Sequence, residues 1–209
     1  MTDQQIMVVS RERLLSPNTF QGFSPHSKFD YESLILRNYG WIEREPVENN
    51  PSFKQPIVYS VIFNPKTRKF FVYQRSKKDQ NYGEKRLQGK RAWGIGGHVD
   101  KQDASPNPLT TSQKRELAEE IEEFKNPKFI NQTRPLGYIN DDEDDVGKVH
   151  FGVAYLISTN LQTLTLKDKE IDFGGFHPIN ELEAMCLCGD VNVENWSRIL
   201  VPQLKKVAS

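Results

Sequence analysis

The chain has 209 residues, enough for one sizeable hydrophobic core, and we expect one domain with an extension rather than two full domains. Lysine plus arginine equals aspartate plus glutamate at 28 each, so the net charge gives no overall basis for binding a nucleic-acid polymer or an anionic membrane. No secretory signal is evident, and no apolar run approaches the roughly 18 residues of a membrane span. These features predict a soluble, cytoplasmic protein.

Residues 1–50 mix proline, serine and asparagine with one helical candidate, FDYESLILRNYG. Asp30 is placed to cap the start of this helix, and Gly40 to stop its end. We interpret residues 1–50 as an N-terminal extension packed on a core domain of residues 51–209. The sequence of residues 1–50 indicates no function for the extension.

Strand signals begin after Pro56. IVYSVIF (57–63) and KFFVYQR (69–75) are β-branched and aromatic runs separated by a turn sequence, which indicates a hairpin. Further strands are predicted at 134–140 and 148–158 around an acidic loop, DDEDDVG. The chain continues with a short strand entering a helix at 174–187 and an amphipathic helix at 191–206. Strands around one central helix, with helices at the end, predict an α/β fold with a mixed sheet covered on both faces.

The central helix contains RELAEEIEEF (115–124), in which five of ten residues are glutamates. Pro106 and Pro108 are expected to prevent an earlier start, and Thr110 with Gln113 resembles a capping box. The helix is predicted to run to about Lys125, before Pro127.

Helical geometry sorts these residues into two neighbouring stripes. At about 100° per residue, four carboxylates line one side and three apolar side chains lie directly beside them. The acidic stripe is Glu116, Glu119, Glu120 and Glu123, and the apolar stripe is Leu117, Ile121 and Phe124. Docking the apolar stripe brings the carboxylates toward the protein, where their repulsion is poorly screened. A hard divalent cation would compensate this charge, and a solvated acidic face is the simpler alternative.

The glycine-rich GIGGHVD lies upstream of this helix, and glycines let the backbone approach a ligand closely. Together the two segments resemble the box of the Nudix hydrolases, a loop, helix, loop site for divalent metal and diphosphate. Gly97 is followed after five residues by a carboxylate, and the helical part matches residue by residue. The matching residues are Gly97, Asp103, Arg115, Glu116, Leu117, Glu119 and Glu120. The resemblance implies the family's α/β/α sandwich for residues of roughly 55–190.

The resemblance also implies site roles. Glu116, Glu119 and Glu120 would bind Mg²⁺, with Mn²⁺ as the alternative, and Gly96 would offer its carbonyl to the same ion. Glu119 would be a ligand or activate water, and Arg115 would orient the glutamates. Gly97 would lie against the substrate. We therefore assign Arg115, Glu116 and Glu119 to catalysis as well.

The sequence departs from the family pattern at three places. Asp103 stands where the family has glutamate, and the spacer from it to Arg115 is longer than usual. Glu122 and Glu123 replace the glycine and the aliphatic residue that end the box. Loss of that glycine predicts that the helix continues for about another turn.

Two further clusters flank the box. In the acidic loop, Glu143 is our candidate for a carboxylate that joins the metal site or acts as base, against a solvated loop tip. Basic residues lie between the second strand and the glycine-rich loop, and we favour Arg75 and Arg91 for charge-assisted contacts to a diphosphate. The other members are Lys77, Lys78, Lys85, Arg86 and Lys90. His98 and His150 are interpreted as ordinary hydrogen-bonded histidines, since no further zinc ligands are evident.

These patterns predict a Mg²⁺-dependent hydrolase that cleaves a phosphoanhydride bond in a nucleoside diphosphate derivative or a similar organic diphosphate. The alternative is a catalytically altered Nudix-like module for ligand sensing or partner binding. An isomerase that uses the same metal and diphosphate geometry is a further alternative. A small-molecule substrate is the expected partner, and a homodimer is left open.

Overall fold

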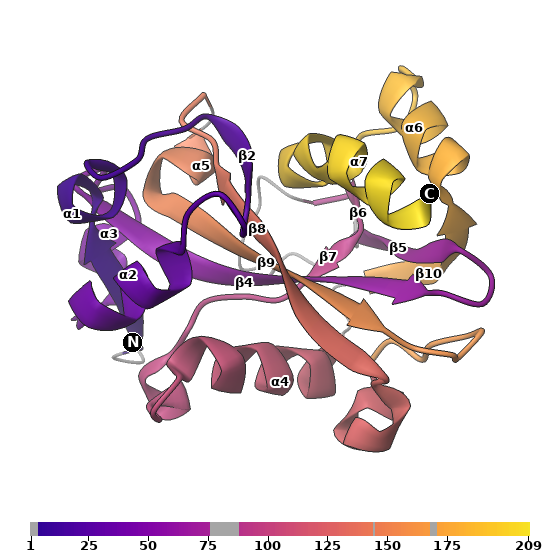
Figure 1. The fold of residues 1–209 in the computed structure, drawn as a ribbon, viewed down its shortest axis with the longest axis horizontal. Coiled ribbons are helices and arrows are strands. Elements are labelled where there is room, and N and C mark those ends of the chain that lie inside the picture. The colour runs from indigo at the N-terminus through magenta and orange to yellow at the C-terminus, as the bar shows by residue number, and fades with distance from the viewer. Residues whose placement is uncertain (1–3, 76–87, 144, 168–170) are drawn as a thin grey trace. The chain divides into compact units, whose positions relative to one another are not determined.

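The computed structural model describes residues 4–75, 88–143, 145–167 and 171–209. It is an α/β chain with a large mixed sheet and several helices, as the sequence predicts, and the strands follow the order β10-β5-β4-β9-β8-β2 (Figure 1). By their contacts the residues form two compact units. The first unit comprises Met1–Tyr59, Gly96–Arg115 and Pro135–Tyr155, and the second comprises Ser60–Ile95, Glu116–Arg134 and Leu156–Ser209.

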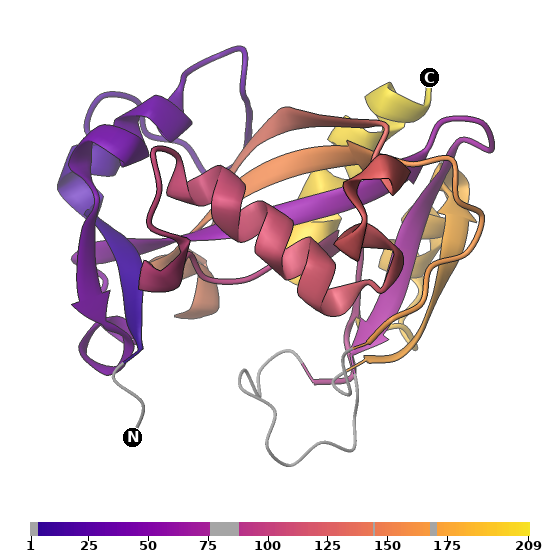
Figure 2. The ribbon, with the colours of Figure 1, turned by 90° about the horizontal axis from the view of Figure 1, so that it is seen from below.

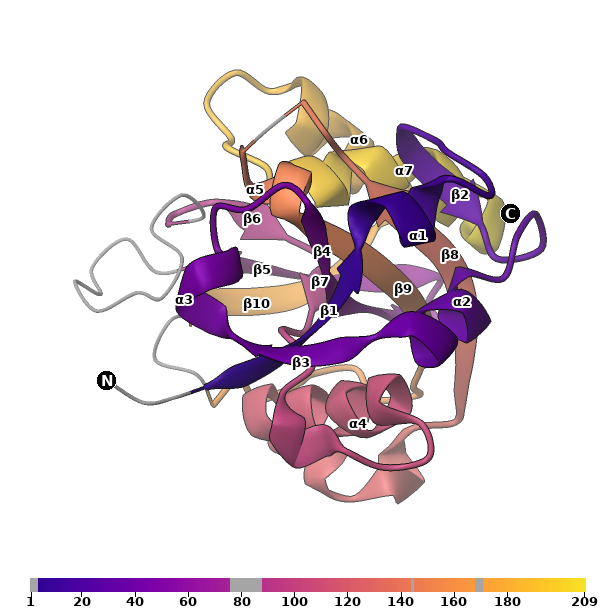
Figure 3. The same cartoon turned by 90° about the vertical axis from the view of Figure 1, so that its left-hand side faces the viewer.

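In the first unit, β1 (Gln5–Ser10) lies between two antiparallel partners (Figure 3). It pairs with β3 (Gly40–Glu43) through residues 5–8. Its last two residues, Val9 and Ser10, pair with Lys54 and Phe53 at the start of β4 (Phe53–Asn64). A second pairing joins β2 (Gly22–Pro25) to the end of β8 (Gln132–Asn140). The first-unit helices are α1 (Arg11–Leu15), α2 (Tyr31–Asn38), α3 (Arg44–Val47) and α5 (Asp145–Val149).

The predicted helix in the first fifty residues is present as α2. Asp30 caps it as expected, because its side chain accepts a hydrogen bond from the amide of Ser33 at 2.9 Å. The helix ends at Asn38, and Gly40 opens β3. Tyr31 is fully buried, with its ring 5.3 Å from that of Phe151, so this helix packs on the first unit's core. A domain boundary at residue 50 stays a prediction.

In the second unit, the predicted hairpin forms between β4 and β5 (Lys69–Arg75), with Phe63 opposite Phe70. The side chain of Asn64 accepts hydrogen bonds from the amides of Lys66 and Thr67, which fixes the turn. β5 also pairs with β10 (Ile171–Pro178) and with the short β6 (Arg91–Ala92). The other short strand, β7 (Gly94–Ile95), pairs with β4. The strand β9 (His150–Ser158) contributes residues to both units.

Helices lie on both faces of the second unit's strands. The C-terminal part of α4 (Pro108–Glu120) lies on one face, and α6 (Ile179–Leu187) and α7 (Asn195–Ala208) lie on the other (Figures 1 and 3). Leu200 and Leu204 of α7 are fully buried, which agrees with the amphipathic pattern. This layering confirms the predicted α/β/α sandwich. Among the described residues, no helix has the length and apolarity needed to span a membrane.

Candidate active site

The start of α4 differs from the prediction. The helix begins at Pro108, and Asn107 caps it: the amides of Thr110 and Thr111 donate to Asn107 Oδ1 at 3.0 Å and to its carbonyl at 3.2 Å. Proline is well tolerated at the first helical position, where its missing N–H would have no helical partner. The expected start at Thr110 is therefore wrong.

The end of α4 also differs. The helix stops at Glu120 instead of continuing for another turn, and two short 3₁₀ turns follow at Glu123–Lys125 and Pro127–Phe129 (Figure 2). Lys167 supplies donors for the last carbonyls, from its amide to Glu120 O and from Nζ to Ala118 O, both at 2.9 Å. A segment distant in the sequence thus terminates the helix in place of the family's glycine.

The residues of α4 divide by exposure as the two-stripe pattern predicts. Leu117 and Ile121, which follow the helical spacing, are fully buried. Glu116 and Glu120 are half-buried, and Glu119 is exposed. The apolar stripe therefore docks the helix, and the neighbouring carboxylates lie at the boundary between protein and solvent.

Arg115 is fixed to the loop that precedes the helix. Its Nε donates to Asp103 Oδ1 at 2.8 Å, and Nη2 donates to Asp103 Oδ2 at 2.9 Å and to the carbonyl of His98 at 3.1 Å. Asp103 is only 1% exposed and also accepts a hydrogen bond from the amide of Asp100. The shorter carboxylate at this position is thus compatible with a two-point contact to the arginine.

The glycines of the loop lie against β4. The carbonyl of Gly97 accepts a hydrogen bond from the amide of Val58 at 3.1 Å. Gly96 has φ +147°, and a Cβ there would lie 1.9 Å from the Val58 carbonyl oxygen. Close backbone approach therefore requires glycine at position 96. The assigned roles of Gly96 in metal binding and of Gly97 in substrate binding stay predictions.

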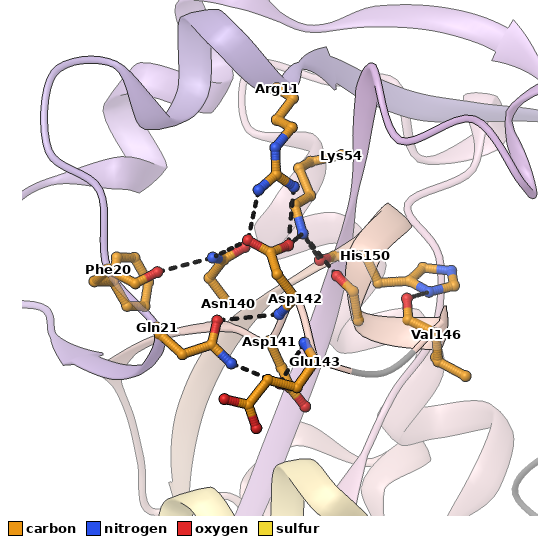
Figure 4. A network of polar contacts seen from close by, with 11 residues as sticks. Arg11, Phe20, Gln21, Lys54, Asn140, Asp141, Asp142, Glu143, Val146 and His150 are labelled. Carbon is orange, nitrogen blue, oxygen red and sulfur yellow. Dashed lines mark hydrogen bonds and ion pairs between the residues drawn. The ribbon is translucent and has the colours of Figure 1, made fainter.

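The acidic loop is only partly a solvated tip (Figure 4). Glu143 is exposed, and its amide donates to Asp141 Oδ1 at 3.3 Å. Asp141 is 1% exposed, and Asp142 accepts hydrogen bonds from Arg11 and Lys54. Asp144 lies outside the described residues. A solvent-exposed loop tip therefore describes Glu143, whereas Asp141 is buried and Asp142 is bound by Arg11 and Lys54.

Lys54 is a buried cation that the sequence reasoning missed. Its Nζ donates to Asp142 Oδ1 at 2.8 Å, to Gly147 O at 2.6 Å and to His150 O at 3.2 Å. Burial lowers the pKa of Lys54, and the hydrogen bond to Asp142 opposes this shift. Arg11 and Lys54 together hold the pKa of Asp142 well below its usual range. The available signal was the position of Lys54 just before the apolar run 57–63, which β4 extends to include.

His98 and His150 are hydrogen-bonded, as predicted, and the structure also pairs them with each other, with their Nε2 atoms 3.1 Å apart. Since the carbonyl of Val146 can only accept, His150 Nδ1, at 2.7 Å from it, carries a hydrogen. His98 Nε2 also lies 2.8 Å from Gln55 Oε1. Burial, followed by the neighbouring His150, lowers the pKa of His98 well below its ordinary value of 6.5. The His98 ring is therefore neutral at physiological pH.

A sequence comparison gives one informative relative. The chain is 32% identical over 212 residues to Protein YmaB of Bacillus subtilis (strain 168), and the match covers 97% of this chain and 98% of YmaB. The two proteins belong to one family. A scan against protein-family models finds no match.

Solved structures with a similar fold include Nudix proteins. Tm1382, a protein assigned to the Nudix hydrolases, has a TM-score of 0.77 at 23% identity, covering 97% of this chain and 99% of that chain. The NUDIX domain of Shewanella oneidensis NrtR, solved with ADP ribose, has a TM-score of 0.55 at 18% identity, covering 75% and 89%. The shared fold agrees with the box residues on α4. The chain has the Nudix fold.

The basic residues predicted to contact a diphosphate lie in the second unit, at the end of β5 and on β6. Arg75 Nη2 is 3.8 Å from Glu194 Oε1, and its guanidinium lies 5.4 Å from the centre of the Tyr73 ring. The guanidinium of Arg91 lies 5.7 Å from the ring centre of Phe173, which is 51% exposed. Lys90 is half-buried, and Lys77, Lys78, Lys85 and Arg86 lie outside the described residues.

Arg91 also borders a cavity of about 380 Å³. Its lining is rich in amide and carboxylate side chains, and comprises Gln74, Gln88, Gly89, Arg91, Asp190, Val191 and Asn192. The backbone of Arg91 is fixed by hydrogen bonds with Asn192 O and with the amide of Glu194. Arg91 thus borders a polar cavity, and Arg75 lies close to the carboxylate of Glu194.

Proposed function

We propose that this Nudix protein is a metal-dependent hydrolase that cleaves a phosphoanhydride bond in a nucleoside diphosphate derivative or a similar organic diphosphate. The observation that carries the proposal is the arrangement of α4. Its apolar side is buried, and Glu116, Glu119 and Glu120 lie at the boundary with solvent, directly after Arg115. The ADP ribose bound to the NrtR domain is a ligand of the proposed class.

The donor set fits Mg²⁺ or Mn²⁺. Within the described ranges, no three His, Cys, Asp or Glu side chains form a group that could hold a metal ion. Mg²⁺ commonly uses one or two carboxylates and completes its octahedron with waters and substrate phosphates, so it does not need such a cage. Glu116, Glu119 and Glu120 would share the binding of the ion, one or two of them directly and the rest through its waters, with the Gly96 carbonyl as a further ligand. When bound, the ion would neutralise the diphosphate and lower the pKa of a bound water.

The chain's own residues would act around that diphosphate. Glu119 or Glu143 would take the proton from the attacking water. Arg115, held by Asp103, would keep the glutamate side of α4 in place. Arg75 and Arg91 would contact phosphate oxygens, and the backbone at Gly97 would allow close approach of the substrate.

A second candidate function is a binding module for the same class of ligand, without turnover. The NUDIX domain of NrtR was solved in complex with ADP ribose, so a domain with this fold can bind such a ligand. A binding module would hold its ligand without Mg²⁺ and release no product. A hydrolase would require the ion, and an isomerase would return a rearranged diphosphate.

The test is a panel of nucleoside diphosphate derivatives incubated with Mg²⁺ or Mn²⁺, with released nucleotides and phosphates as the readout. Glu120→Gln should lower metal-dependent turnover by on the order of 100-fold or more while the protein stays folded. Glu122→Gln is the matched control, because Glu122 is exposed and pairs with Lys125 on the surface. Full activity of Glu120→Gln would refute the assignment.

A further inference from the structure

We propose that Lys54 and Arg11 are positioning residues that hold Asp142 and Gly147 of the acidic loop, and through Asp142 the neighbouring Glu143, in the geometry needed for catalysis. The inference rests on the proposed function, in which Glu143 is a candidate base. It also gives a role to the N-terminal segment. The residues concerned all belong to the first unit.

Lys54 closes the loop at both ends. Its ammonium group binds Asp142 at the start of the loop and the carbonyls of Gly147 and His150 at its end. An ammonium has three N–H donors, and these acceptors match that number. Because the Lys54 side chain is fully buried, its ammonium group has low competition from water. The buried ammonium group of Lys54 therefore contacts the loop on both sides of Glu143 in the sequence, at Asp142 and at Gly147.

The N-terminal segment also contacts the start of the loop, and Arg11 reaches Asp142 beside Lys54 (Figure 4). Arg11 donates from both terminal nitrogens to the two oxygens of Asp142. Gln21 donates to Asp141 Oδ1 at 2.8 Å and accepts from the amide of Asp142 at 3.1 Å. Asn140 binds both Phe20 O, at 2.8 Å, and Asp142 Oδ2, at 3.2 Å. The position of Asp142 is thus set by several independent donors.

Two further backbone contacts lie within the described part of the loop. A Cβ at Gly147 would lie 1.9 Å from the Asp141 carbonyl oxygen, so the loop is closed by direct backbone approach. The amide of Glu143 is tied to Asp141 Oδ1. Glu143 is nevertheless exposed, which leaves its carboxylate accessible to a substrate. The network therefore orders the backbone under an accessible acidic side chain.

Lys54→Met keeps most of the side-chain volume and removes the charge, and Arg11→Gln is a milder variant because the Arg11 side chain is 35% exposed. Arg11→Lys retains the charge and serves as the conservative rescue. Tyr155→Phe is the control for lost stability, since it removes a hydrogen bond from β9 to Glu32 of the N-terminal segment without touching the loop. Each variant is measured by amide hydrogen exchange of residues 141–147 and by kcat and KM across pH with the best substrate of the panel.

We expect Lys54→Met and Arg11→Gln to speed exchange at the amides of Asp142 and Glu143. Both should lower kcat by about 10- to 100-fold with a smaller change in KM, and should alter the pH profile of kcat. Arg11→Lys should recover part of the loss, and Tyr155→Phe should leave loop exchange and the pH profile unchanged.

If the wild type is active, two results would overturn this inference and leave the proposed function standing. One is an unchanged kcat and pH profile in Arg11→Gln. The other is unchanged hydrogen exchange of the loop in both Lys54→Met and Arg11→Gln. If Lys54→Met does not fold, Arg11→Gln decides the matter. A wild-type chain that hydrolyses no member of the panel would overturn the proposed function and the catalytic role of the loop together. In that case, unchanged loop exchange in the variants would also refute the positioning of the loop.

Discussion

The guanidinium of Arg115 makes a two-point contact with the carboxylate of Asp103, at 2.8 Å and 2.9 Å. Asp103 belongs to the 3₁₀ turn Lys101–Asp103, and Arg115 lies two turns into α4, so the contact joins the loop to the helix across the longer spacer. The planar fork of arginine matches a carboxylate in this geometry. The helix is thus attached to its preceding loop immediately before the glutamates.

This contact predicts a specific loss of stability in Asp103→Asn. The substitution keeps the shape but leaves the Arg115 side chain, 17% exposed, without its carboxylate. We expect the free energy of unfolding in urea to fall by roughly 3 kcal/mol. Glu181→Gln, which alters an exposed pair with His177, should change it by less than about 0.5 kcal/mol. Equal effects of the two substitutions would contradict a structural role for the contact.

Gly96→Ala should be strongly destabilising. The new methyl group would overlap the Val58 carbonyl, and φ +147° is unfavourable for residues other than glycine, so the loop or β4 must shift. We expect a loss of more than about 2 kcal/mol in thermal or urea unfolding. Gly40→Ala is the matched control in the same unit, because a Cβ at position 40 would point into open space, with no contact within 4 Å. A loss no greater than that of Gly40→Ala would rule out the close approach.

The stability of the protein should fall in acid partly through Asp142. Its pKa in the folded state is held below the unfolded value by Arg11 and Lys54, so the folded state favours the carboxylate. This stabilisation is fully present above the unfolded pKa of about 3.9 and is lost as the pH falls toward the folded pKa. Urea unfolding of the wild type and Asp142→Asn from neutral pH to below about pH 4 should show a shallower acid decline in the variant. Parallel curves would exclude this contribution.

The two glutamates after the box should differ in their effect on stability. Glu123 accepts from the amide of Thr165 at 2.9 Å and from its hydroxyl at 2.8 Å, whereas Glu122 forms an exposed pair with Lys125. Glu123→Ala should lower the free energy of unfolding by about 1–2 kcal/mol. Glu122→Ala should lower it by less than about 0.5 kcal/mol. A reversed order would show that the Thr165 contact does not stabilise the helix end.

Local patterns predicted the elements whose signals lie within one segment. The β4–β5 hairpin was readable because its turn is fixed by Asn64, and the docking of α4 because Leu117 and Ile121 recur at helical spacing. The strands of the first fifty residues were missed. β1 is defined by pairing with β3 and β4, and a four-residue strand such as β3 gives little periodicity by itself.

The misses around the site have the same physical origin. The end of α4 depends on Lys167, and the acidic loop depends on Arg11 and Lys54, all of which are distant in sequence from the groups they contact. A helical wheel places carboxylates on a face but contains no information on such partners. The box resemblance was recognisable because its glycines and carboxylates, with their spacing, lie within one continuous segment.

The buried ammonium of Lys54 also constrains the order of events during synthesis. Its acceptors Asp142, Gly147 and His150 follow it by 88, 93 and 96 residues. Until His150 has left the ribosome, burial of this lysine in β4 lacks acceptors and is unfavourable. We therefore expect the first unit to fold late, and a fragment that ends before Asp142 to leave the N-terminal part of β4 unprotected in hydrogen exchange.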